Sequence, residues 1–182
     1  MATFNSTITG SNTGDTLIGT EADQLIQAGT NNDSIGSKFG TSSLYGNAGN
    51  DTFFANANVP GVGVASTLSG AQGSDSFAFG TYGLTSVRIG GDDDADTFNI
   101  QGPVVSTSLY GGSGSDSLRI ATTQVLGADL RGEAGDDTFD LTGSLVSSYV
   151  HGGKDADRIT VTGTVTKSTV NGGVGADLID LK

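Results

Sequence analysis

Apolar residues recur along this chain at two fixed distances from a repeated aspartate. The aspartates follow one another at intervals of 18 to 24 residues: Asp15, Asp33, Asp51, Asp75, Asp96, Asp116, Asp137, Asp157 and Asp177. An apolar side chain stands two residues after each one: Leu17, Ile35, Phe53, Phe77, Phe98, Leu118, Phe139, Ile159 and Ile179. Another stands seven residues before: Ile8, Ile26, Leu44, Leu68, Ile89, Leu109, Leu130, Val150 and Val170. The chain is therefore a series of nine aligned repeats, each built on one anchor aspartate.

The pattern around each anchor is typical of short β-strands with one buried face. Leu118 and Ile120 alternate with the polar Arg119, and other repeats show the same period of two. A single repeat cannot bury its own apolar face, so neighbouring repeats must supply the core. We expect an all-β, right-handed parallel β-solenoid, a hybrid of β-roll and β-helix, with about nine coils of roughly 18–24 residues stacked about 4.8 Å apart.

The repeat lengths predict one domain over residues 1–182. Residues 1–43 form tighter, β-roll-like coils, and residues 44–182 form wider coils of about 20 residues. Extra residues such as "NANVPGVGVAST", residues 56–67, are expected in the connector opposite the aspartate corner, where a longer loop leaves the strand pairing intact.

Composition supports a turn-rich chain and narrows the choice of partners. The chain has 30 Gly, 2 Pro and no Cys, and its formal net charge is −12. The charge disfavours nucleic acid and favours a cation. The absence of Cys excludes disulfides and thiolate zinc sites. No apolar run reaches the roughly 20 residues needed to cross a bilayer, and "MATFNSTITG" lacks the pattern of a cleaved signal, so we expect neither membrane insertion nor a classical leader.

The glycine-rich segment before each anchor carries a family resemblance. The segment GGSGSDSLR, residues 111–119, matches the nonapeptide Gly-Gly-x-Gly-x-Asp-x-apolar-x, and GGVGADLID, residues 172–180, follows the same spacing. GNAGNDTFF, GAQGSDSFA and GEAGDDTFD lose the second glycine, while GDDDADTFN and GGKDADRIT are weaker copies. In this pattern the chain resembles the repeats-in-toxin (RTX) family. The resemblance implies a parallel β-roll with Ca²⁺ ions in the corners between successive turns, bound by backbone carbonyls and the motif aspartates.

Calcium also suits the residues themselves. Ca²⁺ takes six to eight oxygen ligands, and carboxylates stacked about 5 Å apart would repel one another by about 3 kcal/mol per neighbour at an effective dielectric near 20. The candidate metal-binding residues are Asp51, Asp75, Asp96, Asp116, Asp137, Asp157 and Asp177, with Asp15 and Asp33 in corners poorer in glycine, and the glycines five residues before the wider-coil anchors: Gly46, Gly70, Gly91, Gly111, Gly132, Gly152 and Gly172. Because the opposite edge mostly lacks Gly-x-Asp, one row of ions is expected, with one further site near Asp23. In the alternative interpretation, each aspartate only caps its corner by accepting backbone N–H groups.

Other features favour structural roles. His151, the single histidine, stands where other repeats carry Tyr45, Tyr110 or Arg131, so an outward surface position is expected. The repeated Phe residues predict an internal stack. "RITVTGTVTKSTV" resembles the Thr arrays of ice-binding solenoids, but other repeats place unrelated residues at the position of Thr160. No serine, histidine and acid arrangement is suggested and there is no Cys nucleophile, so we expect no enzyme.

The pattern as a whole predicts a calcium-binding structural or assembly solenoid of an extracellular, cell-surface (S-layer, adhesin or motility) or virion protein. The alternative is an accessory folding module or glycan-binding module of a secreted RTX-type toxin or polysaccharide-active enzyme. Since the sequence ends on the strand-like "LIDLK", self-association through the solenoid ends is expected, as is contact with surface polysaccharide.

Overall fold

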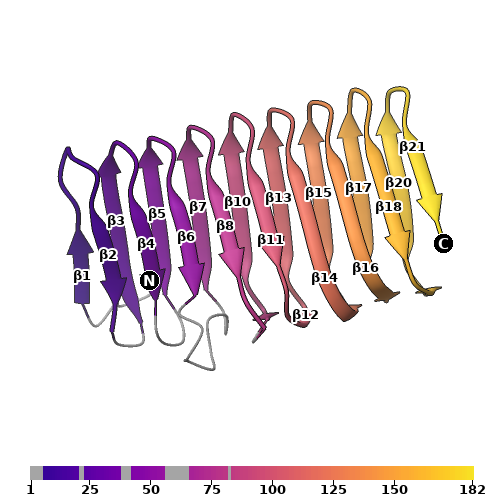
Figure 1. Ribbon diagram of the computed structural model, residues 1–182, viewed down its shortest axis with the longest axis horizontal. Helices are drawn as coiled ribbons and strands as arrows, with labels where there is room; N and C mark the ends of the chain where they lie inside the picture. The colour runs from indigo at the N-terminus through magenta and orange to yellow at the C-terminus, as the bar shows by residue number, and fades with distance from the viewer. Residues whose placement is uncertain (1–5, 21–22, 38–41, 56–65, 82) are drawn as a thin grey trace.

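The fold is a parallel β-solenoid. The computed structural model describes residues 6–20, 23–37, 42–55, 66–81 and 83–182. In these ranges the chain passes repeatedly between two parallel sheets, and each pass places a new strand beside the strand of the preceding coil. Figure 1 shows the coils in chain order from indigo to yellow, with the narrow aspartate corners together along one edge. The predicted all-β, right-handed solenoid is confirmed.

Sheet A contains the strand that precedes the aspartate in each coil. Its nine strands, in spatial order, are β1 (Ser6–Thr9), β3 (Gln24–Thr30), β5 (Ser43–Ala48), β7 (Thr67–Gln72), β10 (Arg88–Asp93), β13 (Ser108–Ser113), β15 (Asp129–Ala134), β17 (Tyr149–Lys154) and β20 (Thr169–Val174). Nine strands give eight steps from coil to coil, or about eight full turns.

Sheet B contains the strand that follows the aspartate. Its strands are β2 (Thr16–Gly19), β4 (Ser34–Ser37), β6 (Thr52–Ala55), β8 (Ser76–Phe79), β11 (Thr97–Ile100), β14 (Ser117–Leu126), β16 (Thr138–Val146), β18 (Arg158–Thr162) and β21 (Leu178–Leu181). Three two-residue strands extend this sheet beside the long β14 and β16: β9 (Leu84–Thr85), β12 (Val104–Val105) and β19 (Val165–Thr166). The described residues include no helix that is long and apolar enough to span a membrane.

The register of both sheets follows the anchor alignment. In sheet A, Leu109 pairs with Ile89 on one side and Leu130 on the other. In sheet B, Phe98 pairs with Phe77 and with Leu118. Side chains at equivalent positions therefore form straight rows along the solenoid, because parallel in-register pairing repeats each position once per coil.

The core lies between the two sheets and is made of these apolar rows. Phe53, Phe77, Phe98 and Phe139 are fully buried, which confirms the predicted internal stack. The rings of Phe53 and Phe77 have centroids 4.6 Å apart, and those of Phe77 and Phe98 are 4.8 Å apart. These spacings match the distance between coils, so the rings of Phe53, Phe77 and Phe98 stack directly on one another.

From the second coil on, the first strand of each coil extends into the segment before the anchor aspartate. For example, β13 continues from Leu109 through Gly111 and Gly112 to Ser113. Leu109, Gly112 and Ser113 pair with neighbouring coils on both sides, so the strand pairing continues into the corner. Of the predicted insertion at 56–67, residues 56–65 lie outside the described residues.

Candidate functional site

The anchor aspartates form a row inside the corners between sheet A and sheet B. Asp116, for example, lies in the short turn between β13 and β14. Seven of the nine carboxyl side chains are buried, with 1 or 2 % of their surface exposed: Asp33, Asp51, Asp75, Asp96, Asp116, Asp137 and Asp157. Asp15 and Asp177, in the first and last coils, are half-buried. The row therefore runs through the interior and does not lie on the surface.

One carboxylate oxygen of each anchor aspartate from Asp33 to Asp177 joins neighbouring coils. The Oδ1 atom of Asp137 accepts the backbone N–H of Asp116 at 2.8 Å, and the Oδ1 atom of Asp116 accepts the N–H of Asp96 at 2.8 Å. The same bond recurs at every one of the eight steps, with distances from 2.6 to 3.0 Å. In the capping alternative, each aspartate accepts backbone N–H groups of its own corner. The observed bond instead joins the carboxylate to a backbone N–H in the corner of the preceding coil.

The other carboxylate oxygen has no hydrogen-bond donor in the seven buried aspartates. In the first coil the arrangement differs, since Asp15 Oδ2 accepts the backbone N–H of Ser11 at 2.6 Å and its hydroxyl at 2.9 Å. A buried polar atom without a partner costs free energy, and more so when it carries charge. Among the described residues, the buried side-chain atoms without a hydrogen-bond partner are this row of Oδ2 atoms and Asn99 Oδ1.

The glycine five residues before each wider-coil anchor makes room for this oxygen. A Cβ atom at Gly111 would lie 2.1 Å from Asp116 Oδ2 and 2.7 Å from the carbonyl oxygen of Gly132 in the next coil. The same crowding occurs at Gly46, Gly70, Gly91, Gly132, Gly152 and Gly172. The other two glycines of this segment have a different role: Gly112 and Gly114 take positive φ angles of 116° and 125°, whereas Gly111 does not.

Burial raises the pKa of the carboxyl groups in the middle of the row. The pKa is raised from 3.8 to about 6 in Asp51 and Asp116, to about 7 in Asp75 and Asp137, and to about 8 in Asp96. Desolvation is the largest cause, the backbone hydrogen bond opposes it, and neighbouring carboxylates add to the rise. The carboxyl groups of this row are therefore favoured in the protonated form, or in the ionised form with a positive charge close by.

A second buried polar row consists of hydroxyl side chains, and the sequence pattern did not lead us to expect it. It lies nine residues before the anchors and contains Ser42, Ser66, Thr107 and Ser148. The Ser148 hydroxyl accepts the backbone N–H of Ala128 at 3.1 Å and donates to the carbonyl of Val146 at 3.0 Å. A hydroxyl both donates and accepts, but an ionised carboxylate only accepts. Serine or threonine at this offset in six of the nine repeats was the available signal.

The oxygen atoms along the aspartate row fit, as metal ligands, the calcium that the RTX resemblance implies. Each buried anchor from Asp33 to Asp157 offers one unpartnered carboxylate oxygen, and the corner backbone adds carbonyl oxygens such as that of Gly132. These are the hard oxygen ligands that Ca²⁺ prefers. Across the described ranges, no three acidic, histidine or cysteine side chains converge as a metal cluster. Backbone carbonyls would therefore have to supply most of the ligands to each ion. Asp23, with a φ angle of 56° before β3, belongs to the other edge, and a site there stays a prediction.

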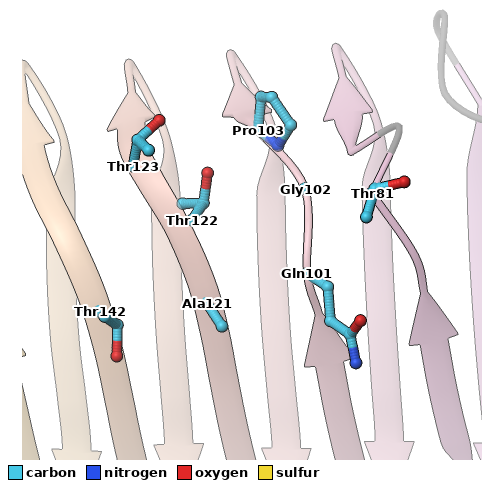
Figure 2. A pocket seen from close by; sticks show the side chains of 8 residues that line it. All are labelled: Thr81, Gln101, Gly102, Pro103, Ala121, Thr122, Thr123 and Thr142. Carbon is cyan, nitrogen blue, oxygen red and sulfur yellow. The ribbon is translucent and has the colours of Figure 1, made fainter.

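A shallow pocket of about 450 Å³ lies on sheet B, away from the aspartate corners (Figure 2). It extends over several coils and is lined by Thr81, Gln101, Gly102, Pro103, Ala121, Thr122, Thr123 and Thr142. Figure 2 shows the lining side chains spread over neighbouring coils, with Ala121, Thr122 and Thr123 on the same strand. This lining offers hydroxyl and amide groups but contains no titratable side chain, so it provides no acid–base pair for catalysis.

Comparison with known proteins adds no assignment. No family model matches the chain, and neither a curated protein nor a solved structure matches it. The resemblance to the RTX family therefore rests on the spacing of the glycine–aspartate motif alone.

Proposed function

We propose that this chain is a calcium-binding structural β-solenoid of an extracellular, cell-surface or virion assembly, and that it acts through its shape and surface and not as an enzyme. Several Ca²⁺ ions would be held along the aspartate row, mainly by the buried anchors between Asp33 and Asp157 and by corner carbonyls. When bound, the ions would supply the positive charge that the row lacks.

The unpartnered Oδ2 atoms carry this proposal. Seven buried carboxylates each have one oxygen with a hydrogen bond and one without. In the hydroxyl row of the same fold, by contrast, the Ser148 hydroxyl is satisfied by backbone groups of neighbouring residues and coils. A metal ion that binds only the folded chain stabilises it by mass action, which links folding to calcium concentration. Folding would then be favoured where calcium is millimolar, outside the cell.

The direct test is thermal unfolding followed by far-UV circular dichroism. The protein is first treated with a chelator and then melted without divalent ions, with Ca²⁺, and with Mg²⁺. We expect the melting temperature to rise with the logarithm of calcium concentration. Mg²⁺ should have a smaller effect, since it demands octahedral geometry and loses its water reluctantly. Equal melting temperatures in chelator and in saturating Ca²⁺ would rule the proposal out.

A second candidate function is an accessory or glycan-binding module of a secreted toxin or polysaccharide-active enzyme. The observation in its favour is the group of arginine and tyrosine side chains on the outer face of sheet A. A binding experiment on this function requires a ligand that fits the outer face of sheet A.

A further inference from the structure

Cationic and aromatic side chains alternate across four coils on the outer face of sheet A. They come from β10, β13, β15 and β17, which are consecutive strands of that sheet. We call the group the arginine–tyrosine stripe, and it consists of Arg88, Tyr110, Asp129, Arg131, Tyr149 and His151. In a chain with a net charge of −12, two arginines and the single histidine on one face stand out from the acidic surroundings.

The side chains of the stripe contact one another in sequence along the solenoid. The guanidinium carbon of Arg88 lies 4.4 Å from the ring centroid of Tyr110. The guanidinium carbon of Arg131 lies 5.8 Å from the Tyr110 ring and 5.3 Å from the Tyr149 ring. The Tyr149 and His151 rings are 5.8 Å apart. Cation–π contact of this kind holds a guanidinium against a ring while its N–H groups, which point outward in the plane, stay available.

The two arginines differ in what they have left to bind. Arg131 donates from Nε and Nη2 to the two carboxylate oxygens of Asp129, at 2.8 and 2.9 Å. Arg88 is exposed, and within the described ranges no carboxylate lies within ion-pair distance of it. Thr67 and Ser108 flank Arg88 in register on the neighbouring strands. Arg88 is thus a positioned guanidinium with free donors and a hydroxyl residue on each side.

We propose that the stripe binds a carboxylated polysaccharide, a uronate chain laid along the solenoid axis, with a uronate carboxylate on Arg88. A guanidinium binds a carboxylate through two parallel N–H bonds, which matches the free donors of Arg88. Coils repeat about every 4.8 Å, close to the length of one hexose in an extended chain, so successive sugars can meet successive coils. Tyrosine and hydroxyl side chains provide the amphipathic contacts and hydrogen bonds that sugar rings use.

Charge density argues against a nucleic acid as the occupant of this face. The phosphate backbone binds through many simultaneous cationic contacts, and the stripe has one unpaired guanidinium on a strongly acidic chain. An oligosaccharide can also bind through the hydroxyl groups and faces of its sugar rings, so it depends less on the number of cationic contacts. This inference does not depend on the calcium proposal, because the stripe faces solvent and the aspartate row faces the interior.

The test is isothermal titration of the calcium-loaded protein with two matched ligands. One is a β-1,4-linked oligoglucuronate, and the other is the β-1,4-linked oligoglucose of equal length, which lacks only the carboxylates. The variants are Arg88→Gln and, as the matched control, Arg119→Gln on the outer face of sheet B, where Arg119 Nε lies 3.8 Å from Asp140. Circular dichroism confirms that each variant is folded.

We expect saturable binding of the oligoglucuronate, a loss of at least about tenfold in affinity in Arg88→Gln, and unchanged affinity in Arg119→Gln. The neutral oligosaccharide should bind much more weakly. The proposal is overturned by equal binding of the two ligands, by full affinity in Arg88→Gln, or by no saturable binding. It is also overturned if chelation abolishes binding while the circular dichroism is unchanged, since calcium would then bridge the uronate to the acidic surface.

Discussion

The Oδ1 atom of Asp137 accepts the backbone N–H of Asp116 at 2.8 Å, although 21 residues separate the two in sequence. This bond makes each buried carboxylate a link between consecutive coils. The Oδ2 atom of the same carboxylate is left without a donor, so the link carries an electrostatic cost. Variants of the Asp116 corner can separate the benefit of the link from that cost.

Replacing Asp116 by Asn should stabilise the calcium-free protein and weaken its response to calcium. The amide oxygen keeps the bond to the N–H of Asp96. The amide N–H₂ replaces the unpartnered acceptor oxygen by a hydrogen-bond donor and removes the negative charge. We expect the urea midpoint without calcium to rise, and the increase in midpoint on adding Ca²⁺ to be smaller than in the wild type. Asp140→Asn, at an exposed position, is the control. A fall in the calcium-free midpoint of Asp116→Asn would show that the charge itself is favourable.

Replacing Gly111 by Ala should destabilise the solenoid by about 2–4 kcal/mol. The added Cβ would lie 2.1 Å from Asp116 Oδ2 and 2.7 Å from the carbonyl of Gly132, so the carboxylate and the neighbouring coil must both move. The matched control is Gly80→Ala, because nothing lies within 4 Å of a Cβ at Gly80. Urea denaturation measures both. Equal midpoints for the two variants would contradict the role of Gly111 in leaving room for the carboxylate.

The calcium-free protein should become more stable as the pH falls from about 8 to about 4. The pKa of Asp96 is raised to about 8 and that of Asp137 to about 7, against 3.8 for an ordinary Asp. The folded chain therefore binds more protons than the unfolded chain within this range, and stability is lost as the pH rises through the folded pKa values. Urea midpoints at several pH values test this.

Two controls isolate the aspartate row in that experiment. Saturation with Ca²⁺ should flatten the dependence on pH, because the ion takes the place of the protons. The double variant Asp96→Asn and Asp137→Asn should reduce the slope, since these groups no longer titrate. A midpoint that climbs between pH 5 and pH 8 without calcium would mean that the row is stable in its ionised form.

Truncation of Phe77 to Ala should cost about 3–5 kcal/mol of stability. The Phe77 ring is fully buried and stacks on Phe53 and Phe98, so its removal leaves a cavity between two coils. Phe54→Ala is the control, because Phe54 lies on the outer side of β6 and is only half-buried. Urea midpoints compare the two variants, and a loss no larger in Phe77→Ala than in Phe54→Ala would contradict the role of the stack.

Much of the fold could be predicted because it repeats. The apolar residues at fixed offsets from the anchors determined which side chains face inward, and the structure places Leu109, Phe98 and Phe139 in the buried rows as expected. Periodicity of two specifies the buried face of a strand, and a repeat of constant length specifies which neighbour it meets. The row of anchor aspartates on one edge follows from the same alignment.

The sequence could not determine which way the anchor side chains point, because both directions suit a glycine-rich corner. The tertiary structure turns them inward, where the backbone N–H of the preceding coil is available to Oδ1 and no donor reaches Oδ2. It also brings together Arg88 and Arg131, which stand at different repeat positions, because residues eight and six before an anchor share the outer face of sheet A. The sequence by itself therefore determined the repeat, the core rows and the acidic edge. Only the packing of coil against coil decided which polar groups are satisfied, since those bonds cross between residues about 20 positions apart.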